Sequence, residues 1–310
     1  MEVHINMQYE IRTDLALENR EIYRTAQKLE DEIPGVETEF DDSDNEILIT
    51  KVKILSEEGA NALGKPIGNY ITIESQMMND EVESIDNKII EKVASIIKDV
   101  SHLVKSDTVL VVGLGNDDVT PDALGPRVIE NLQITRHLIT YAPEYIKEGT
   151  RAVSAIIPGV LGTTGIETSE IVKGIVDRVN PDLVIVIDAL ASKNMDRISK
   201  TIQIADTGII PGSGVGNSRF AITKEVLGVP VVVIGVPTVV GVPTIVDESI
   251  NFVIDKHTDE AQKEELKKTN YMKEILENKK FDFMVTPKDI DDIINNLSTL
   301  VADSINMALN

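Results

Sequence analysis

The sequence contains no cysteine in its 310 residues. This absence excludes disulfide bridges, thiolate zinc sites and a cysteine nucleophile, and it is typical of proteins that fold in a reducing interior. No stretch approaches the roughly 20 uninterrupted apolar residues that span a bilayer, and the amino terminus lacks the basic and apolar regions of a signal peptide. These absences predict a cytoplasmic protein that has no membrane partner.

Basic residues are also scarce. The chain has 30 Lys and Arg against 52 Asp and Glu, which gives a formal net charge of −22. Such a charge repels phosphate backbones, and no concentrated basic segment stands out, so direct binding to nucleic acid is not expected. The acidity can serve solubility, or it can attract basic and DNA-associated protein partners. Charge alone leaves both interpretations open.

The middle of the chain alternates short apolar runs with helical patterns. The β-branched runs are residues 108–112, 152–157, 183–187 and 231–234, and the helical patterns are 124–132, 167–179 and 245–254. Strands that are apolar on both faces and alternate with helices predict an α/β fold with a mostly parallel central sheet, covered by helices on both faces. Ligands of such sheets bind beyond the carboxyl ends of the strands.

Peripheral elements surround this centre. Strands are expected at 47–55 and 70–74, a helical turn at 58–63, and helices at 18–32, 80–105 and 290–309. The charged stretch of about residues 256–281 is interpreted as a surface insertion. The sequence thus predicts one α/β domain with appended elements.

Two glycine-rich stretches have the outline of nucleotide sites. Residues 59–66 have P-loop spacing, but Pro66 stands where the Mg²⁺-binding hydroxyl belongs. Residues 113–118 follow a predicted strand, yet Asp118 replaces the third glycine of a dinucleotide fingerprint and Asp117 would repel phosphate. No nucleotide cofactor is therefore expected.

Nucleophile and metal motifs are equally weak. Ser213, in the polar loop 211–217, lacks the Gly-x-Ser-x-Gly frame of a nucleophile elbow. The four histidines form no helical ligand pair and no zinc motif, although His137 lies near the expected loops of the central sheet. They are His4, His102, His137 and His257. The sequence predicts no metal ligands among them.

Two aspartates differ from the acidic background. Asp122 lies in the strand-to-helix turn before Leu124, and Asp188 ends the apolar run 183–187. Taken singly, the first would be a helix cap and the second a turn residue. Both are expected at the same edge of the sheet, however, and two carboxylates that converge in a partly apolar site can hold one proton between them. One then acts as a base toward water and the other as an acid toward a carbonyl, which is peptide-hydrolysis chemistry.

Several longer stretches resemble the germination protease family of spore-forming bacteria. They are residues 111–116, 119–126, 154–160, 164–168, 187–190, 211–217 and 284–288. The resemblance implies an endopeptidase that begins the degradation of small acid-soluble spore proteins during germination, in the forespore and spore core. It also implies a homotetramer and a fold related to the hydrogenase maturation proteases. The two functional aspartates of the family match Asp122 and Asp188.

The resemblance further implies a precursor that trims its own amino terminus. Residues 12–18 resemble a substrate site, with an acidic residue before a small apolar run, which predicts a propeptide of residues 1–14 cut between Asp14 and Leu15. The mature domain would then be 15–310, and it is shorter than is usual in the family between about 256 and 281. Two alternatives stay open: a metal-assisted peptidase of the same fold, and a non-catalytic maturation factor that only grips peptides.

Overall fold

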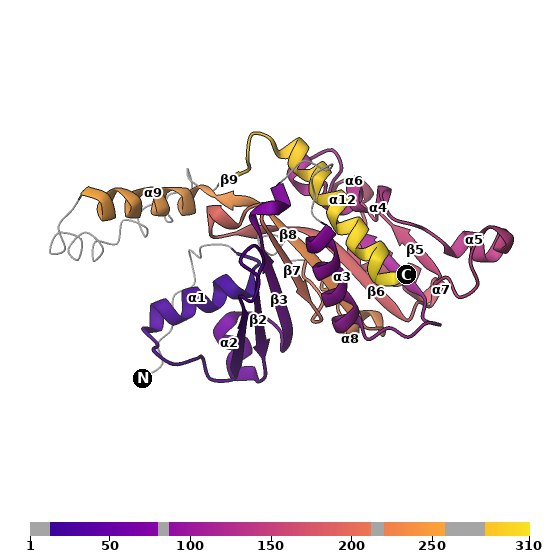
Figure 1. The fold of residues 1–310 in the computed structure, drawn as a ribbon, viewed down its shortest axis with the longest axis horizontal. Helices are drawn as coiled ribbons and strands as arrows, with labels where there is room; N and C mark the ends of the chain where they lie inside the picture. The colour runs from indigo at the N-terminus through magenta and orange to yellow at the C-terminus, as the bar shows by residue number, and fades with distance from the viewer. Residues whose placement is uncertain (1–12, 80–86, 212–219, 258–282) are drawn as a thin grey trace.

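A nine-stranded sheet forms the centre of the computed structural model, which describes residues 13–79, 87–211, 220–257 and 283–310 (Figure 1). The strands are β1 (Val36–Asp41), β2 (Leu48–Ile54), β3 (Gly68–Glu74), β4 (Val109–Gly113), β5 (Val153–Ile156), β6 (Leu183–Ser192), β7 (Thr201–Ala205), β8 (Val231–Gly241) and β9 (Met284–Val285). Their order across the sheet is β1-β2-β3-β7-β8-β6-β4-β5, and β9 pairs with β8.

The predicted parallel centre is present. β5 pairs with β4, β4 with β6, and β6 with β8, all in parallel. Every residue of β4 is buried, and β6 is buried apart from one half-buried position, because helices cover both faces. The four apolar runs of the sequence correspond to these four strands, which confirms the α/β prediction.

The other half of the sheet is antiparallel, and it extends the prediction. β1, β2, β3 and β7 follow one another in antiparallel pairs, and β7 joins this wing to the parallel centre through an antiparallel pair with β8. The patterning did not indicate β1 or β7. β1 is an edge strand with only its first residue buried, and β7 has five residues, so neither gives a long apolar signal.

Helices pack on both faces of the sheet. They are α1 (Ala16–Gln27), α2 (Glu57–Leu63), α3 (Asn87–Ser101), α4 (Leu124–Glu130), α5 (Arg136–Tyr141), α6 (Leu161–Thr164), α7 (Thr168–Val179), α8 (Lys224–Leu227), α9 (Val242–His257) and α12 (Ile290–Leu309). One core lies between the sheet and α3, α4 and α12, which are seen in front of it in Figure 1. On the opposite face α7 and α8 cover the parallel strands, and α1 and α2 cover the antiparallel wing.

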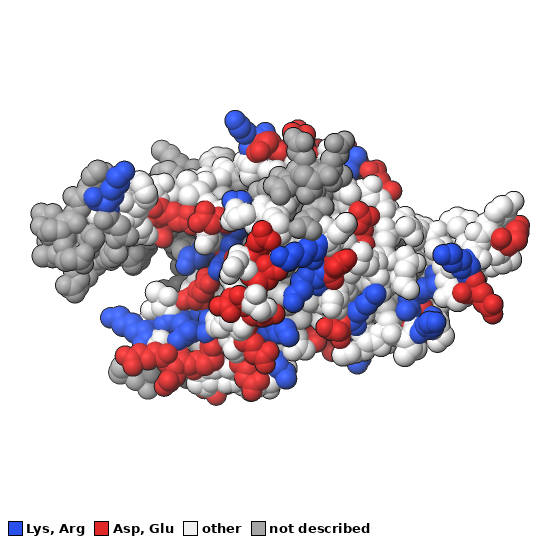
Figure 2. Space-filling model, viewed as in Figure 1, with Lys and Arg blue, Asp and Glu red and all other residues white. Residues whose placement is uncertain are grey.

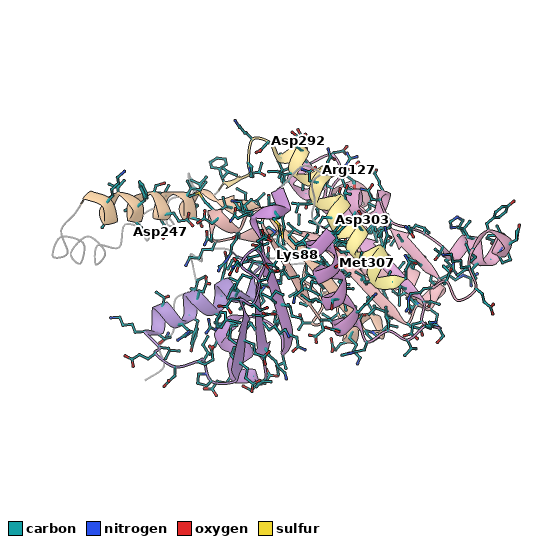
Figure 3. The ribbon with its side chains drawn as sticks, viewed as in Figure 1. Lys88, Arg127, Asp247, Asp292, Asp303 and Met307 are labelled. Carbon is teal, nitrogen blue, oxygen red and sulfur yellow. The ribbon has the colours of Figure 1, made fainter. Side chains whose placement is uncertain are left out.

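Most expected helices are confirmed with shifted ends. The 18–32 pattern corresponds to α1, the 290–309 pattern to α12, and the 80–105 pattern to α3, although residues 80–86 lie outside the described residues. Most of the expected 256–281 insertion, from residue 258 onward, is also outside the described residues. Lys88, labelled in Figure 3, joins the start of α3 to the β1–β2 hairpin through ion pairs with Asp44 and Glu46 at 2.7 and 3.0 Å.

No helix within the described ranges is long and apolar enough to cross a membrane. On the face seen in Figure 2, Lys and Arg side chains are scattered among acidic ones rather than gathered.

The packing of α4 on β4 depends on two glycines in backbone contact. A Cβ atom added to Gly113 would lie 2.4 Å from the carbonyl oxygen of Gly125, and a Cβ added to Gly125 would lie 2.2 Å from that of Leu114. Both distances are shorter than any real Cβ contact, so side chains here would force the helix away from the strand. This contact fixes where α4 begins, and with it the turn that carries Asp122.

We expect Gly125→Ala to lower the free energy of unfolding by about 1–3 kcal/mol, the usual cost of overpacking, although alanine favours a helix. The matched control is Gly174→Ala in α7, where nothing lies within 4 Å of the added Cβ and the change should raise stability by about 0.5–1 kcal/mol. Urea unfolding of the two variants would measure both. A stabilised Gly125→Ala variant would show that the backbone contact is not needed.

Candidate active site

Asp122 lies in the turn between β4 and α4, as predicted. It ends the short 3₁₀ turn η3 (Thr120–Asp122), two residues before α4 begins. The backbone N–H of Asn116 donates to its carboxylate Oδ2 at 2.9 Å, and the same N–H lies 3.1 Å from its carbonyl oxygen. Gly115 has a φ of +116°, and a Cβ there would lie 1.9 Å from that carbonyl oxygen, so the loop closes only around a glycine. Asp122 is thus held against the end of β4.

Asp188 is not at the end of its strand, which corrects the sequence-based expectation. β6 continues to Ser192, and Asp188 is only 7% exposed within it. The neighbouring strand β4 does stop at this level, because its last residue, Gly113, pairs with Ile187. Asp188 is therefore the first residue of β6 that has no partner in β4. It lies at the rim of the parallel sheet, where β4 ends.

The Asp188 carboxyl is set apart by its charge environment. Burial raises its pKa well above the ordinary range of an aspartate, and the negative charges of Asp122 and Asp14 raise it further. The N–H of Ala189, which donates to Oδ1 at 3.0 Å, opposes this shift. Burial and the charge of Asp122 thus act in the same direction on the Asp188 carboxyl, and both favour its neutral form.

The residues around the predicted cleavage bond lie beside this pair. The N–H of Asp14 donates to the carbonyl oxygen of Ala191 in β6 at 2.9 Å, and the Asp14 carboxylate accepts from the N–H of Ala191 at 2.9 Å. Leu15 and Ala16 are both completely buried. Asp14 also lies near the half-buried Lys65: burial lowers the pKa of that amine, and the charge of Asp14 acts against the shift. The structure thus brings Asp14, Asp122 and Asp188 together, although Asp14 is far from the others in sequence.

A buried glutamine, which the sequence patterning did not reveal, spans the same segment. Gln203 in β7 is 7% exposed; its Nε2 donates to the carbonyl oxygen of Asp14 at 3.2 Å, and its Oε1 accepts from the N–H of Ala16 at 2.8 Å. Gln203 pairs in register with Gly235 of β8, which pairs with Asp188 of β6. The one sequence signal was a polar residue within the apolar run of β7. It points to a site only when β7 is known to lie beside β8.

A second buried carboxylate fixes the start of α1. Glu18 has no exposed surface and accepts from the hydroxyl of Ser192 at 2.8 Å and from the N–H groups of Lys193 and Asn194 at 2.6 and 3.0 Å. The Thr13 hydroxyl also donates to it. Arg197 forms ion pairs with Glu18 and Glu21 of α1, at 3.4 and 2.8 Å, and with Glu74 of β3 at 2.8 Å, and so ties the helix to that strand. These contacts hold residues 13–18 at the carboxyl end of β6.

A bulge in β8 connects the two aspartate-bearing elements. The register of β8 against β6 shifts after Pro237, so that Thr238 is the extra residue. The Thr238 hydroxyl donates to the carbonyl oxygen of Pro121 at 2.7 Å, next to Asp122, and the Thr286 hydroxyl donates to the carbonyl oxygen of Thr238 at 2.8 Å. The bulge therefore positions the turn of Asp122 over the strand beside Asp188.

The remaining motifs do not join this site. His137 is exposed on α5, which projects from the far end of the sheet in Figure 1, and His102 is exposed at the end of α3. Ser213 and His4 lie outside the described residues. Gly59 is inside α2 rather than in a phosphate-binding loop. In the part of the chain that the structure describes, no three histidine, aspartate or glutamate side chains gather so that they could hold a metal ion.

The fold and the coupled carboxyl groups define an α/β protein with an aspartate site at the rim of its parallel strands. The sequence profile of the germination protease family matches residues 15–270. Germination proteases of Caldanaerobacter subterraneus subsp. tengcongensis, Clostridium perfringens and Geobacillus sp. WCH70 are 49%, 46% and 41% identical to the chain. The alignments cover 96%, 97% and 97% of this chain and 94%, 95% and 94% of the relatives. The chain belongs to the germination protease family, and it is a protease of spore germination.

Among solved structures, the hydrogenase maturation protease HycI from Thermococcus kodakarensis KOD1 matches 46% of this chain and 80% of its own, at 22% identity and a TM-score of 0.29. A TM-score this low does not establish a common overall fold. The α/β assignment therefore rests on the sheet itself.

We expect Asp188→Asn to stabilise the fold more at high pH than at low pH. The raised pKa of Asp188 gives the wild type a contribution that is fully present below about pH 4 and is lost as the pH rises through the folded-state pKa. Asparagine does not titrate, so the melting temperature of the variant should exceed that of the wild type by a few degrees at pH 8 and by less at pH 4. Calorimetry at both pH values measures this. An equal difference at the two pH values, or the same pattern in the exposed control Asp118→Asn, would contradict the burial of a neutral carboxyl.

Proposed function

We propose that the chain is the precursor of an endopeptidase that begins the degradation of small acid-soluble spore proteins, in the forespore and spore core, and that it processes itself between Asp14 and Leu15. One observation carries this proposal. Leu15 is completely buried and Asp14 is half-buried at the carboxyl end of β6, with Asp14 close enough to raise the pKa of Asp188. A propeptide that simply trailed from the domain would have no reason to sit at the aspartate pair.

The proposed reaction is hydrolysis by two aspartates that share a proton. Water adds through its oxygen to the carbonyl carbon of Asp14, one of its protons passes to the ionised Asp122, and the proton of Asp188 passes to the carbonyl oxygen. The resulting diol collapses: the carbon–nitrogen bond breaks, Asp122 gives its proton to the nitrogen of Leu15, and a diol hydroxyl returns a proton to Asp188. One water is consumed and both carboxyl groups regain their starting states. The raised pKa of Asp188 supports its role as the proton holder.

The same placement accounts for an inactive precursor. Residues 13–16 fill the space beside Asp188, so another polypeptide cannot enter until they leave. The complete burial of Leu15 and Ala16 also keeps water from the peptide bond while α1 is seated. Processing in this scheme needs water to reach the bond, and the loss of residues 1–14 then frees the part of the site that Asp14 occupies.

A metal-assisted mechanism is the alternative within the same fold. It would use the same carboxylates as ligands, so substitution of Asp122 or Asp188 cannot separate the two mechanisms. Loss of activity with a chelator, followed by recovery with one divalent ion, favours the metal; activity that persists in the chelator favours the aspartate pair alone.

A homotetramer is proposed as the assembled form. The helices α5 and α9 project from opposite ends of the sheet in Figure 1. Large apolar side chains are exposed in both regions. Tyr141 of α5 is 85% exposed, Tyr145 that follows it is 79% exposed, and Phe252 of α9 is 66% exposed. Apolar surface gathered on projecting elements is typical of protein contact sites. It supports the burial of these elements against other copies of the chain.

Mass spectrometry of a small acid-soluble spore protein, incubated with the chain lacking residues 1–14, tests the activity. We expect cleavage after an acidic residue, slower by at least about 100-fold in Asp122→Asn and Asp188→Asn, because each loses a proton-transfer group. Asp118→Asn, an exposed aspartate in the same loop as Asp122, should cleave as the parent does. Cleavage by all variants would leave the protease and remove the aspartate mechanism. Intact substrate with every chain would support the peptide-gripping alternative.

Light scattering after size-exclusion chromatography tests the assembly. The wild type should have the mass of four chains, and the double substitution Tyr141→Ser with Tyr145→Ser should shift the mass toward dimers or monomers. Phe40→Ser, which changes an exposed aromatic residue on the edge strand β1, is the control and should not alter the mass. A wild-type monomer would contradict the proposal.

A further inference from the structure

We propose that Gln203 is a catalytic residue, whose amide N–H polarises the carbonyl of the bond to be cut and stabilises the charge that develops on its oxygen. The inference rests on the proposed processing between Asp14 and Leu15, and it adds a third catalytic group that neither the family motifs nor the aspartate pair requires. Its starting point is the hydrogen bond from Nε2 of Gln203 to the carbonyl oxygen of Asp14.

The direction of that bond is fixed by its companion. The other end of the amide, Oε1, lies 2.8 Å from the backbone nitrogen of Ala16, which can only donate. The oxygen of the amide must therefore face Ala16, and the nitrogen must face the carbonyl of Asp14. A reversed amide would set two donors against each other at Ala16 and two acceptors against each other at Asp14. Gln203 thus presents a donor to the one atom of the segment on which negative charge develops during hydrolysis.

The two contacts bracket the bond. The carbonyl of Asp14 lies on one side of Leu15 and the N–H of Ala16 on the other, so the amide grips the chain across the peptide that is predicted to be cut. Asp14 is held from a different strand as well, by Ala191 of β6. The peptide is fixed between β6 and β7, and this fixed geometry is what a donor needs in order to act without reorganising during the reaction.

The position of Gln203 in the sheet places it on the same side as the aspartate. Directly paired residues of neighbouring strands point to the same face, and the row Gln203, Gly235, Asp188 runs across β7, β8 and β6. Two strand spacings separate the outer members, which is about 10 Å between their Cα atoms. The middle member has no side chain, and a Cβ there would lie 2.4 Å from the side chain of Leu190, which fills that space. The row therefore carries two polar side chains, the acid Asp188 on β6 and the donor Gln203 on β7. The apolar side chain of Leu190 lies between them, over Gly235.

Negative charge develops on the carbonyl oxygen of Asp14 during the proposed addition of water. When water adds to the carbonyl carbon, the electron pair of the C=O bond moves to the oxygen that Nε2 faces. The contact, 3.2 Å in the ground state, strengthens as that charge grows, and the low polarity of a buried site increases its effect. Gln203 transfers no proton and is unchanged at the end, while Asp122 and Asp188 carry the proton transfers.

Self-processing of the full-length chain tests the inference, with the mass of the product and the rate of its appearance followed between pH 4 and pH 8. Gln203→Met removes both contacts, whereas Gln203→Glu keeps an acceptor for Ala16 and loses the donor. We expect both variants to process at least about 100-fold more slowly than the wild type at pH 8, the usual effect of losing one such donor. Relative to the wild type at each pH, only Gln203→Glu should recover as the pH falls, because its new carboxyl then carries a proton that it can donate.

The outcomes separate the inference from a purely anchoring role. If Gln203 only holds the chain at Ala16, Gln203→Glu will process like the wild type at pH 8, and this result would overturn the proposal. Normal processing by Gln203→Met would overturn it as well. Gln27→Met, on the exposed side of α1, is the matched control and should process normally. A wild type that is never cut between Asp14 and Leu15 would instead refute the proposed function on which the inference rests. Should the Met variant not fold, the pH dependence of Gln203→Glu still decides.

Discussion

The burial of an aspartic acid within an apolar strand is the constraint on which the rest of the site depends. A carboxyl group among the valines and isoleucines of β6 is costly when charged, and the nearby charges of Asp122 and Asp14 increase that cost. Both effects raise the pKa of Asp188 well above the ordinary range of an aspartate. The glycine contact between β4 and α4, the closed loop around Gly115 and the bulge at Thr238 all act on the distance between this acid and Asp122.

Glu18 and Asp188 are two buried carboxyl groups with different surroundings. Glu18 accepts from two backbone N–H groups, from hydroxyls and from Arg197. These contacts fix the start of α1 against the end of β6. The Asp188 carboxyl accepts from the backbone N–H of Ala189, and the charged groups that act on it are the acids Asp122 and Asp14. Glu18 thus anchors a helix, whereas burial among like charges gives Asp188 the perturbed pKa that is typical of functional carboxyl groups.

The sequence predicted the parallel centre of the fold, because four apolar runs alternating with helical patterns have few other solutions. It also selected Asp122 and Asp188, since each follows or interrupts a buried run near the carboxyl end of a strand. It did not predict β7, whose five residues give no distinctive period, and Gln203 was missed with it. Nor could local patterning place Asp14 beside Asp188, because that contact depends on how α1 seats against β6. Proximity between distant segments is a property of the packed sheet rather than of any short window.

The order of strands in the sheet has a consequence for the timing of assembly. The contact between Gln203 and Asp14 joins residues 189 apart in the chain, and β7 can take its place only when β3 and β8 stand on either side of it. Contacts of such long range form late, because loop closure has to precede them. A chain emerging from the ribosome therefore lacks the seat of its own amino terminus on β7 until β8 has been made. The proposed self-processing would therefore follow the completion of the sheet, because Asp14 and Leu15 meet the aspartates only in the packed fold.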